Sequence, residues 1–201
     1  GSEMCIRDSD NIYVPQGWYR ITETLKMKPD TKLIGLHPFG TQFRLDESTA
    51  AFSGFGGPKA MVESSEGGAN MLVGIGINTG GYNYRAVGVK WMANADSYMN
   101  DVKFVGGHGG LWKPKPGVEE PRGRWNRPAR ISSPDNPVAA SGMDLAWDNQ
   151  YWSLWVTNNG GGTFKDIWTA STYATNGFYA NNTSTPVSYT HLRAHETLAN
   201  L

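Results

Sequence analysis

The stretch IYVPQGWYRITETLKMKPDTKLIGL, residues 12–36, decides the fold class of this chain. It consists of short apolar runs that Pro and Gly separate, and such runs between turn residues are typical of β-strands. We read strands or extended chain over 12–15, 18–21, 24–28 and 32–36, with turns at 15–17 and 29–30. No part of the chain keeps a helical period over about ten residues, so the sequence predicts an all-β protein.

The same pattern of short strands continues to the far end of the sequence. Further strands are predicted over 42–45, 60–63, 71–77, 87–91, 98–105, 151–156, 162–168 and 177–180. Residues 46–51 are compatible with one short turn of helix. Gly, Asn, Thr and aromatic residues are abundant, and this composition favours short strands joined by tight turns.

Three of these segments, MLVGIGINTG, SYMNDVKFVGG and GGTFKDIWTAS, share one shape. A small or polar turn residue, which is Gly74, Asp101 or Asp166, stands just before a pair of apolar residues. The pairs are Ile75/Ile77, Val102/Phe104 and Ile167/Trp168, with imperfect register in the last. Loosely repeated short strands predict a solenoid, in which each turn buries its inner face by stacking on its neighbours. A right-handed parallel β-helix fits best, and a β-sandwich is the alternative.

The opening stretch also resembles a known group of proteins. Its YVPQGWYRI motif, followed by a strand, a Pro-containing turn and LIG, looks like the first turns of the pectate-lyase-like superfamily of β-helices. The later AVGVKWMANADSYMNDVKFVGG and GGGTFKDIWTAS are similar to coils of glycoside hydrolase family 55, the exo-β-1,3-glucanases. The resemblance covers most of residues 13–186 and implies a right-handed single-stranded parallel β-helix, present as a truncated fragment. Enzymes of that family have two β-helices with the catalytic acid in the second, so the resemblance implies no catalytic residue here.

Both ends of the chain look foreign to this pattern. EMCIRDS, residues 3–9, can be encoded by a DNA element whose reverse complement, read in a shifted frame, encodes PVSYTHL, residues 186–192. The element looks like a transposon end used in sequencing adapters. We therefore interpret residues 1–9 and 187–201 as adapter-derived tails, to be left out of fold reasoning. Residues 10–186 are then a partial β-helix domain with a long insertion at 106–142, and the true termini are expected to lie elsewhere.

Composition excludes several classes of function. With the tails set aside, the only cysteine, Cys5, is lost, and with it disulfides and cysteine nucleophiles. The 18 Lys and Arg residues balance 18 Asp and Glu residues, so no electrostatic case exists for nucleic acid or an anionic membrane. No apolar run approaches the length of a membrane span. No stretch has the spacing of a calcium loop, and GIGINTGG lacks the context of a dinucleotide site, so no metal and no cofactor are expected.

The segment 106–142 carries the main functional expectation. It is rich in Pro, Arg, Lys and Trp and has no strand pattern until its end, and long loops of this kind in compact domains are usually functional or disordered. Tryptophan can stack on the apolar face of a sugar, and arginine can donate to hydroxyls or carboxylates. The candidate saccharide contacts are therefore His108, Trp112, Arg124, Trp125 and Arg127. The alternative is that this segment packs on a missing C-terminal part of the same chain.

Catalytic residues are harder to name. Glycosidases need two carboxyl groups about 5–10 Å apart, and Asp144 and Asp148 beside Trp147 are weak candidates. Asp101 and Asp166 occupy equivalent turn positions, which favours a structural role. His108 lies between glycines that allow close approach of other groups, although a structural histidine is the simpler interpretation.

Three functions remain open. The first is a fragment of a secreted glycoside hydrolase acting on a β-glucan type of polysaccharide, with this piece as scaffold and groove wall. The second is a polysaccharide lyase or epimerase, and the third is a non-catalytic glycan-binding or structural β-helix such as an adhesin or tail spike. The expected partners are a polysaccharide and the rest of the same chain, with neither nucleic acid nor membrane.

Overall fold

The computed structural model describes residues 11–53, 56–81, 83–106, 151–169, 177–183, 188–190 and 193–194. The described residues form three parallel sheets that the chain visits in turn. We call them sheets A, B and C. Sheet A contains β1 (Asn11–Val14), β4 (Lys32–Gly35), β7 (Met71–Val73), β10 (Tyr98–Asn100), β13 (Thr163–Lys165) and β16 (Ser188–Thr190).

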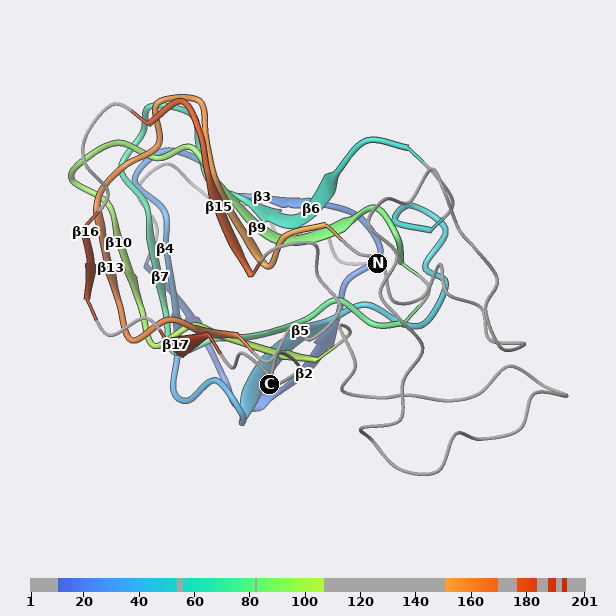
Figure 1. Cartoon of the computed structure of the whole chain (residues 1–201). Helices are drawn as coiled ribbons and strands as arrows, with labels where there is room; N and C mark the ends of the chain where they lie inside the picture. Colours follow the sequence, from blue (N-terminus) through green and yellow to red (C-terminus); the bar gives the residue numbers. More distant parts are fainter. Residues whose placement is uncertain are drawn as a thin grey trace, which may run out of the picture.

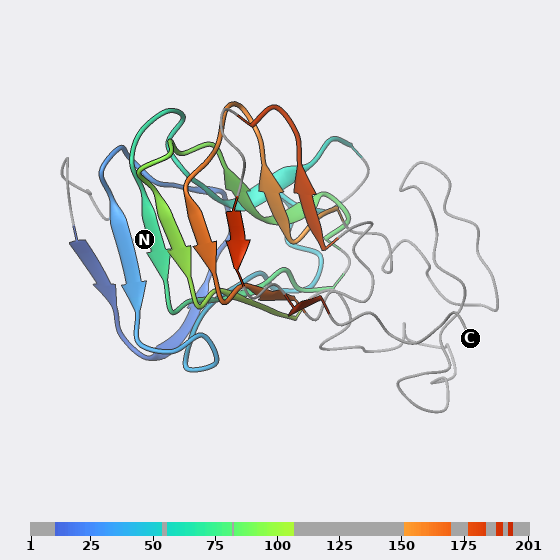
Figure 2. The same ribbon diagram turned by 60° about the vertical axis from the view of Figure 1, so that its left-hand side comes forward.

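The two other sheets repeat this order. Sheet B contains β2 (Gly17–Arg20), β5 (Thr41–Arg44), β8 (Gly76–Asn78), β11 (Lys103–Gly106), β14 (Trp168–Thr169) and β17 (Arg193–Ala194). Sheet C contains β3 (Leu25–Lys26), β6 (Lys59–Glu63), β9 (Ala86–Trp91), β12 (Leu154–Val156) and β15 (Phe178–Ala180). Each passage through A, B and C is one coil, and Figure 2 shows the strands of sheet A side by side, all running the same way.

The chain is therefore a right-handed parallel β-helix, and the predicted fold class is confirmed. In Figure 1 the C-terminal coils lie nearest the viewer, and the chain runs anticlockwise from sheet A through sheet B to sheet C as it advances toward that end. Parallel strands with a right-handed crossover follow from the right-handed twist of each strand. The β-sandwich alternative is wrong, because every strand pairing among the described residues is parallel.

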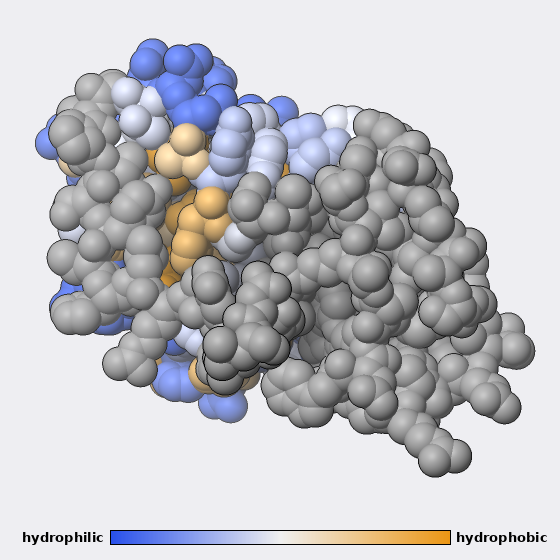
Figure 3. Space-filling model, viewed as in Figure 1, coloured by the Kyte–Doolittle hydropathy of each residue, from blue (hydrophilic) through white to orange (hydrophobic). Residues whose placement is uncertain are grey.

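The core consists of columns of apolar side chains, with one residue from each coil. In sheet A the column is Leu33, Leu72, Met99 and Phe164, at most 1% exposed. Burying one such side chain stabilises a fold by about 1.5–3 kcal/mol, before the entropy of ordering the chain is subtracted. Figure 3, viewed as in Figure 1, shows a patch of apolar residues in the left half of the molecule.

The corner between sheets A and B confirms the repeat seen in the sequence. Gly74, Asp101 and Asp166 adopt left-handed φ values of 65°, 50° and 51°. That conformation bends the chain sharply, and it suits Gly first and short polar residues next. The residues that follow, Ile75, Val102 and Ile167, are fully buried. The Lys103 ammonium lies 3.0 Å from the Asp101 carboxylate and also donates to the Asp166 carbonyl at 3.0 Å, so this corner is structural.

Five sequence expectations need correction. Residues 71–77, 98–105 and 162–168 are each two strands in different sheets, because the left-handed residue turns the chain between them. In the last segment Thr169 and not Trp168 takes the inner position, since Thr169 pairs with Phe104 while Trp168 pairs with Lys103 on the outer side. Residues 46–51 form turns and no helix.

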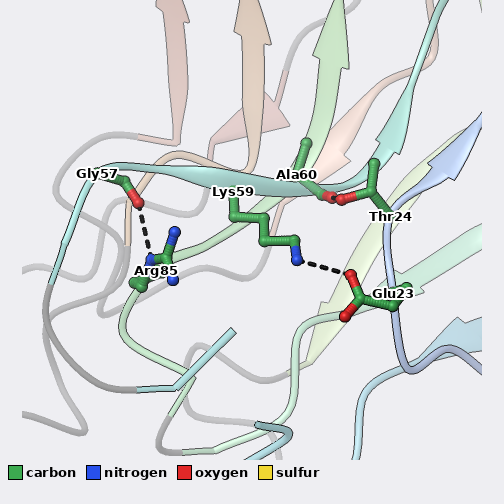
Figure 4. Close-up of polar contacts among 6 residues, drawn as sticks. All are labelled: Glu23, Thr24, Gly57, Lys59, Ala60 and Arg85. Atoms are coloured by element: carbon green, nitrogen blue, oxygen red, sulfur yellow. Dashed lines mark hydrogen bonds and ion pairs between the residues drawn. The ribbon is translucent and has the colours of Figure 1, made fainter. Parts of the chain in front are cut away.

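The corner between sheets B and C varies most from coil to coil. The connecting segments are 21–24, 45–58, 79–85, 107–153 and 170–177. The insertion predicted at 106–142 thus enters at this corner, although residues 107–150 lie outside the described part of the chain. Neighbouring coils are tied together here (Figure 4): Thr24 Oγ1 donates to the Ala60 carbonyl at 2.8 Å, and Arg85 Nε donates to the Gly57 carbonyl at 3.1 Å.

The contact between Glu23 and Lys59 at this corner gives a pH prediction. Lys59 Nζ donates to Glu23 Oε2 at 2.6 Å (Figure 4), and this hydrogen bond lowers the pKa of Glu23. A lowered pKa in the folded state means that the contact stabilises the fold above the unfolded pKa of Glu23. This stabilisation is lost as the pH falls through the folded pKa. We expect Lys59→Met to raise the Glu23 pKa in a carboxyl-detected NMR titration and Lys32→Met, at a distant exposed position, to leave it unchanged. An unchanged Glu23 pKa in Lys59→Met would contradict the contact.

Candidate functional site

The outer surface of sheet C carries the densest group of aromatic side chains among the described residues. Strand register places Trp155 of β12 beside Lys90 of β9 on one side and Tyr179 of β15 on the other. Tyr151 and Trp152 precede β12 and complete the group. All five residues are partly exposed. We call Tyr151, Trp152, Trp155, Tyr179 and Lys90 the aromatic face.

The rings of the aromatic face form one contiguous cluster around Trp152. The Trp152 ring stacks on Tyr179, with centroids 4.3 Å apart and planes at 22°. The centroid of the Trp152 ring lies 4.9 Å from that of Trp155 and 5.5 Å from that of Tyr151. The Lys90 ammonium sits 5.0 Å from the centre of the Trp155 ring, within range of a cation–π interaction. The described rings thus form a pre-formed cluster, with the Lys90 ammonium at its edge.

Polar contacts fix two of these rings. Trp155 Nε1 donates to Asn181 Oδ1 at 2.7 Å, and the Tyr151 hydroxyl donates to the Gly56 carbonyl at 2.9 Å. The second contact joins the start of β12 to the segment between β5 and β6. Both rings are thus held by their polar ends, while the rest of each ring contributes apolar surface.

Local chain geometry explains why Trp152 and Trp155 lie on the same side. A regular strand would point residues three apart to opposite faces. Here Ser153 and Leu154 are both fully buried, and Ser153 Oγ lies 3.0 Å from Thr169 Oγ1 inside the coil. Because two consecutive residues point inward, the inward–outward alternation of side chains shifts by one position. Both tryptophans therefore reach the outer surface.

The chemistry of the aromatic face suits binding more than catalysis. Aromatic faces pack on the apolar CH surfaces of sugar rings, and the Lys90 ammonium can donate to hydroxyls or to a carboxylate. Glu63 pairs with Lys90 in the strand register and is the nearest carboxylate along that outer column. Among the described residues, no group of three or more His, Cys, Asp or Glu could hold a metal ion.

A second set of exposed aromatic residues lies on sheet B. Trp18 is 69% exposed, and the Arg44 guanidinium lies 4.3 Å from its ring centre. Phe39, 53% exposed, belongs to the corner segment that covers β8, and its ring lies 6.2 Å from that of Trp168. These side chains form separate pairs on sheet B and not on sheet C. Substitutions of them are therefore suitable controls for substitutions in the aromatic face.

None of the site residues predicted from sequence can be compared with this geometry. His108, Trp112, Arg124, Trp125, Arg127, Asp144 and Asp148 all lie outside the described residues. The aromatic face itself was missed as a site. Its signal is the YWSLW run at 151–155, a few residues after the long insertion, but Lys90 and Tyr179 join it only through strand register.

No family model, curated protein or solved structure matches the chain. The described residues contain no helix of the length and apolarity that crossing a membrane requires. The functional argument therefore rests on the geometry of the aromatic face and on the sequence resemblance described above.

Proposed function

We propose that this chain is a polysaccharide-binding part of a secreted β-helix protein related to the pectate-lyase-like superfamily. The aromatic face is the observation that carries the proposal. A pre-formed, partly exposed cluster of two tryptophans and two tyrosines offers the apolar surface on which sugar rings pack. The four rings come from residues 151–155 and from Tyr179 of the next coil, so they form one continuous patch on the outer side of sheet C.

A β-glucan type of polysaccharide is the ligand we propose first. The described part of the aromatic face has four rings and one cation, which match a largely neutral glycan better than a densely charged one that would require several cations. The parent protein would then be a glycoside hydrolase of the family 55 type, and this chain would supply scaffold and groove wall. The catalytic carboxyl groups of such an enzyme are not proposed within the described residues.

Binding of a soluble β-1,3-glucan by the whole chain tests this function. We expect Trp155→Ala to weaken binding about tenfold, which corresponds to ~1.5 kcal/mol, the upper range for a single aromatic packing contact. Affinity electrophoresis or titration calorimetry would measure the change. The matched control is Trp18→Ala, which removes an exposed tryptophan from sheet B and should leave the affinity unchanged.

Other outcomes would redirect the assignment. Preferential binding of polygalacturonate, lost in Lys90→Met, would favour an acidic glycan and a lyase or epimerase. Absence of binding to any polysaccharide would overturn the proposal and leave a structural β-helix. If Trp155→Ala and Trp18→Ala lowered the polysaccharide affinity equally, the aromatic face would not be the binding site.

A further inference from the structure

The turn that follows β15 contains a sequence motif whose first residue, Asn181, also contacts the aromatic face through Trp155. Residues 181–184 read Asn-Asn-Thr-Ser, which contains two overlapping Asn-x-Ser/Thr acceptor motifs for N-linked glycans. The first has Asn181 as acceptor and Thr183 as hydroxyl residue. The second has Asn182 as acceptor and Ser184 as hydroxyl residue.

The structure places the first motif on the surface and in a defined turn. Asn181, Asn182 and Thr183 are all exposed. Asn182 adopts a left-handed φ of 53°, and its carbonyl accepts a hydrogen bond from Asn159 N at 2.6 Å. The Asn181 amide N–H donates to the Val156 carbonyl at 2.9 Å. The turn is thus anchored to the preceding coil through its backbone, while its side chains face outward with room for a modification.

The Asn181 side chain is oriented by only one of its two polar atoms. Its Oδ1 accepts the hydrogen bond from Trp155 Nε1, whereas its Nδ2 donates to no described residue. The amide nitrogen is the atom that carries an N-linked glycan. A sugar on Nδ2 would therefore displace no hydrogen bond of the described fold, and its CH surface would meet the neighbouring rings of Tyr179 and Trp155.

We propose that Asn181 is an N-glycosylation site whose glycan covers the aromatic face. In the reaction, Asn181 Nδ2 attacks the anomeric carbon of an oligosaccharide carried on a lipid pyrophosphate. The new C–N bond forms as the C–O bond to pyrophosphate breaks, the lipid pyrophosphate leaves, and the amide nitrogen gives up a proton. The attached sugar then occupies the surface that a free polysaccharide would use, and modification lowers polysaccharide binding. This last step rests on the proposed function, while the modification itself does not.

The test uses the whole chain secreted from eukaryotic cells behind a secretion leader. We expect a glycan-sized mass increment that peptide N-glycosidase removes. Two matched variants identify the acceptor. Thr183→Ala destroys the first motif and keeps the second as Asn-Ala-Ser, whereas Ser184→Ala destroys only the second. Loss of the glycan in Thr183→Ala with retention in Ser184→Ala supports Asn181. No glycan on the unsubstituted chain, or any other pattern in the two variants, overturns the assignment.

Measurements of polysaccharide binding distinguish the proposed function from the proposed glycosylation of Asn181. The unglycosylated chain made in bacteria tests polysaccharide binding alone. If that chain binds and the glycosylated chain binds at least tenfold more weakly, the glycan covers the site. If both bind equally, the glycan does not cover the aromatic face and that part of the inference fails. If neither binds but the mass increment is present, the modification stands and the proposed function fails.

Discussion

Trp91→Ala should lower the free energy of unfolding by about 3–5 kcal/mol, the range for removal of a buried aromatic side chain. Trp91 is the largest fully buried side chain among the described residues, and its ring packs edge-on against Phe164 with centroids 5.9 Å apart. Its Nε1 donates to the Gly161 carbonyl at 2.9 Å, so the substitution leaves both a cavity and an unpaired buried acceptor. Urea unfolding followed by circular dichroism measures the loss.

The matched control for Trp91→Ala is Trp18→Ala. Trp18 is 69% exposed and its main described contact is the Arg44 guanidinium, so the substitution should cost less than about 1 kcal/mol. Equal losses of unfolding free energy in Trp91→Ala and Trp18→Ala would contradict the assignment of Trp91 to the interior of the coil.

Gly76→Val should destabilise the fold by about 3 kcal/mol, the upper part of the range for overpacking. A Cβ atom at Gly76 would lie 2.0 Å from the Pro38 carbonyl oxygen and 2.9 Å from Gln42 Cγ. The nearer atom belongs to the backbone of segment 36–40, which covers β8 on the outer side and cannot yield without moving the corner. The change in melting temperature and in the unfolding free energy would show this cost.

A second glycine provides the control for that clash. A Cβ atom at Gly57 would meet no heavy atom within 4 Å, so Gly57→Val should change stability by no more than about 0.5 kcal/mol. If Gly76→Val left the free energy of unfolding unchanged, segment 36–40 would not lie over β8.

The repeat of the coil could be predicted from sequence because it depends on local chemistry. Gly74, Asp101 and Asp166 are residues that tolerate the left-handed region, and each stands directly before a buried aliphatic residue. Sequence alone could not show that these residues separate two sheets, because apolar residues continue on both sides of the corner. The inner position of Thr169 was missed for a similar reason. Trp168 is the more apolar residue, but pairing with Lys103 places it outside.

The aromatic face depends on information that a single sequence does not contain. Tyr179 and Lys90 are far from Trp155 along the chain and become its neighbours only when coils stack in register. Trp152 reaches the outer surface only because Ser153 and Leu154 both turn inward. The predicted saccharide contacts of segment 106–142 lie outside the described residues and remain predictions. The interpretation of both tails also remains a prediction, although β16 and β17 within residues 187–201 pair with β13 and β14.

The most direct test of polysaccharide binding is an NMR titration of the tryptophan indole N–H signals with a β-1,3-glucan oligosaccharide. Single substitutions assign the signals of Trp155, Trp152, Trp18 and Trp91. If the aromatic face is the binding site, the Trp152 and Trp155 signals shift and saturate together while those of exposed Trp18 and buried Trp91 stay in place. Shifts confined to Trp18, or no saturable shift at Trp152 and Trp155, would contradict it.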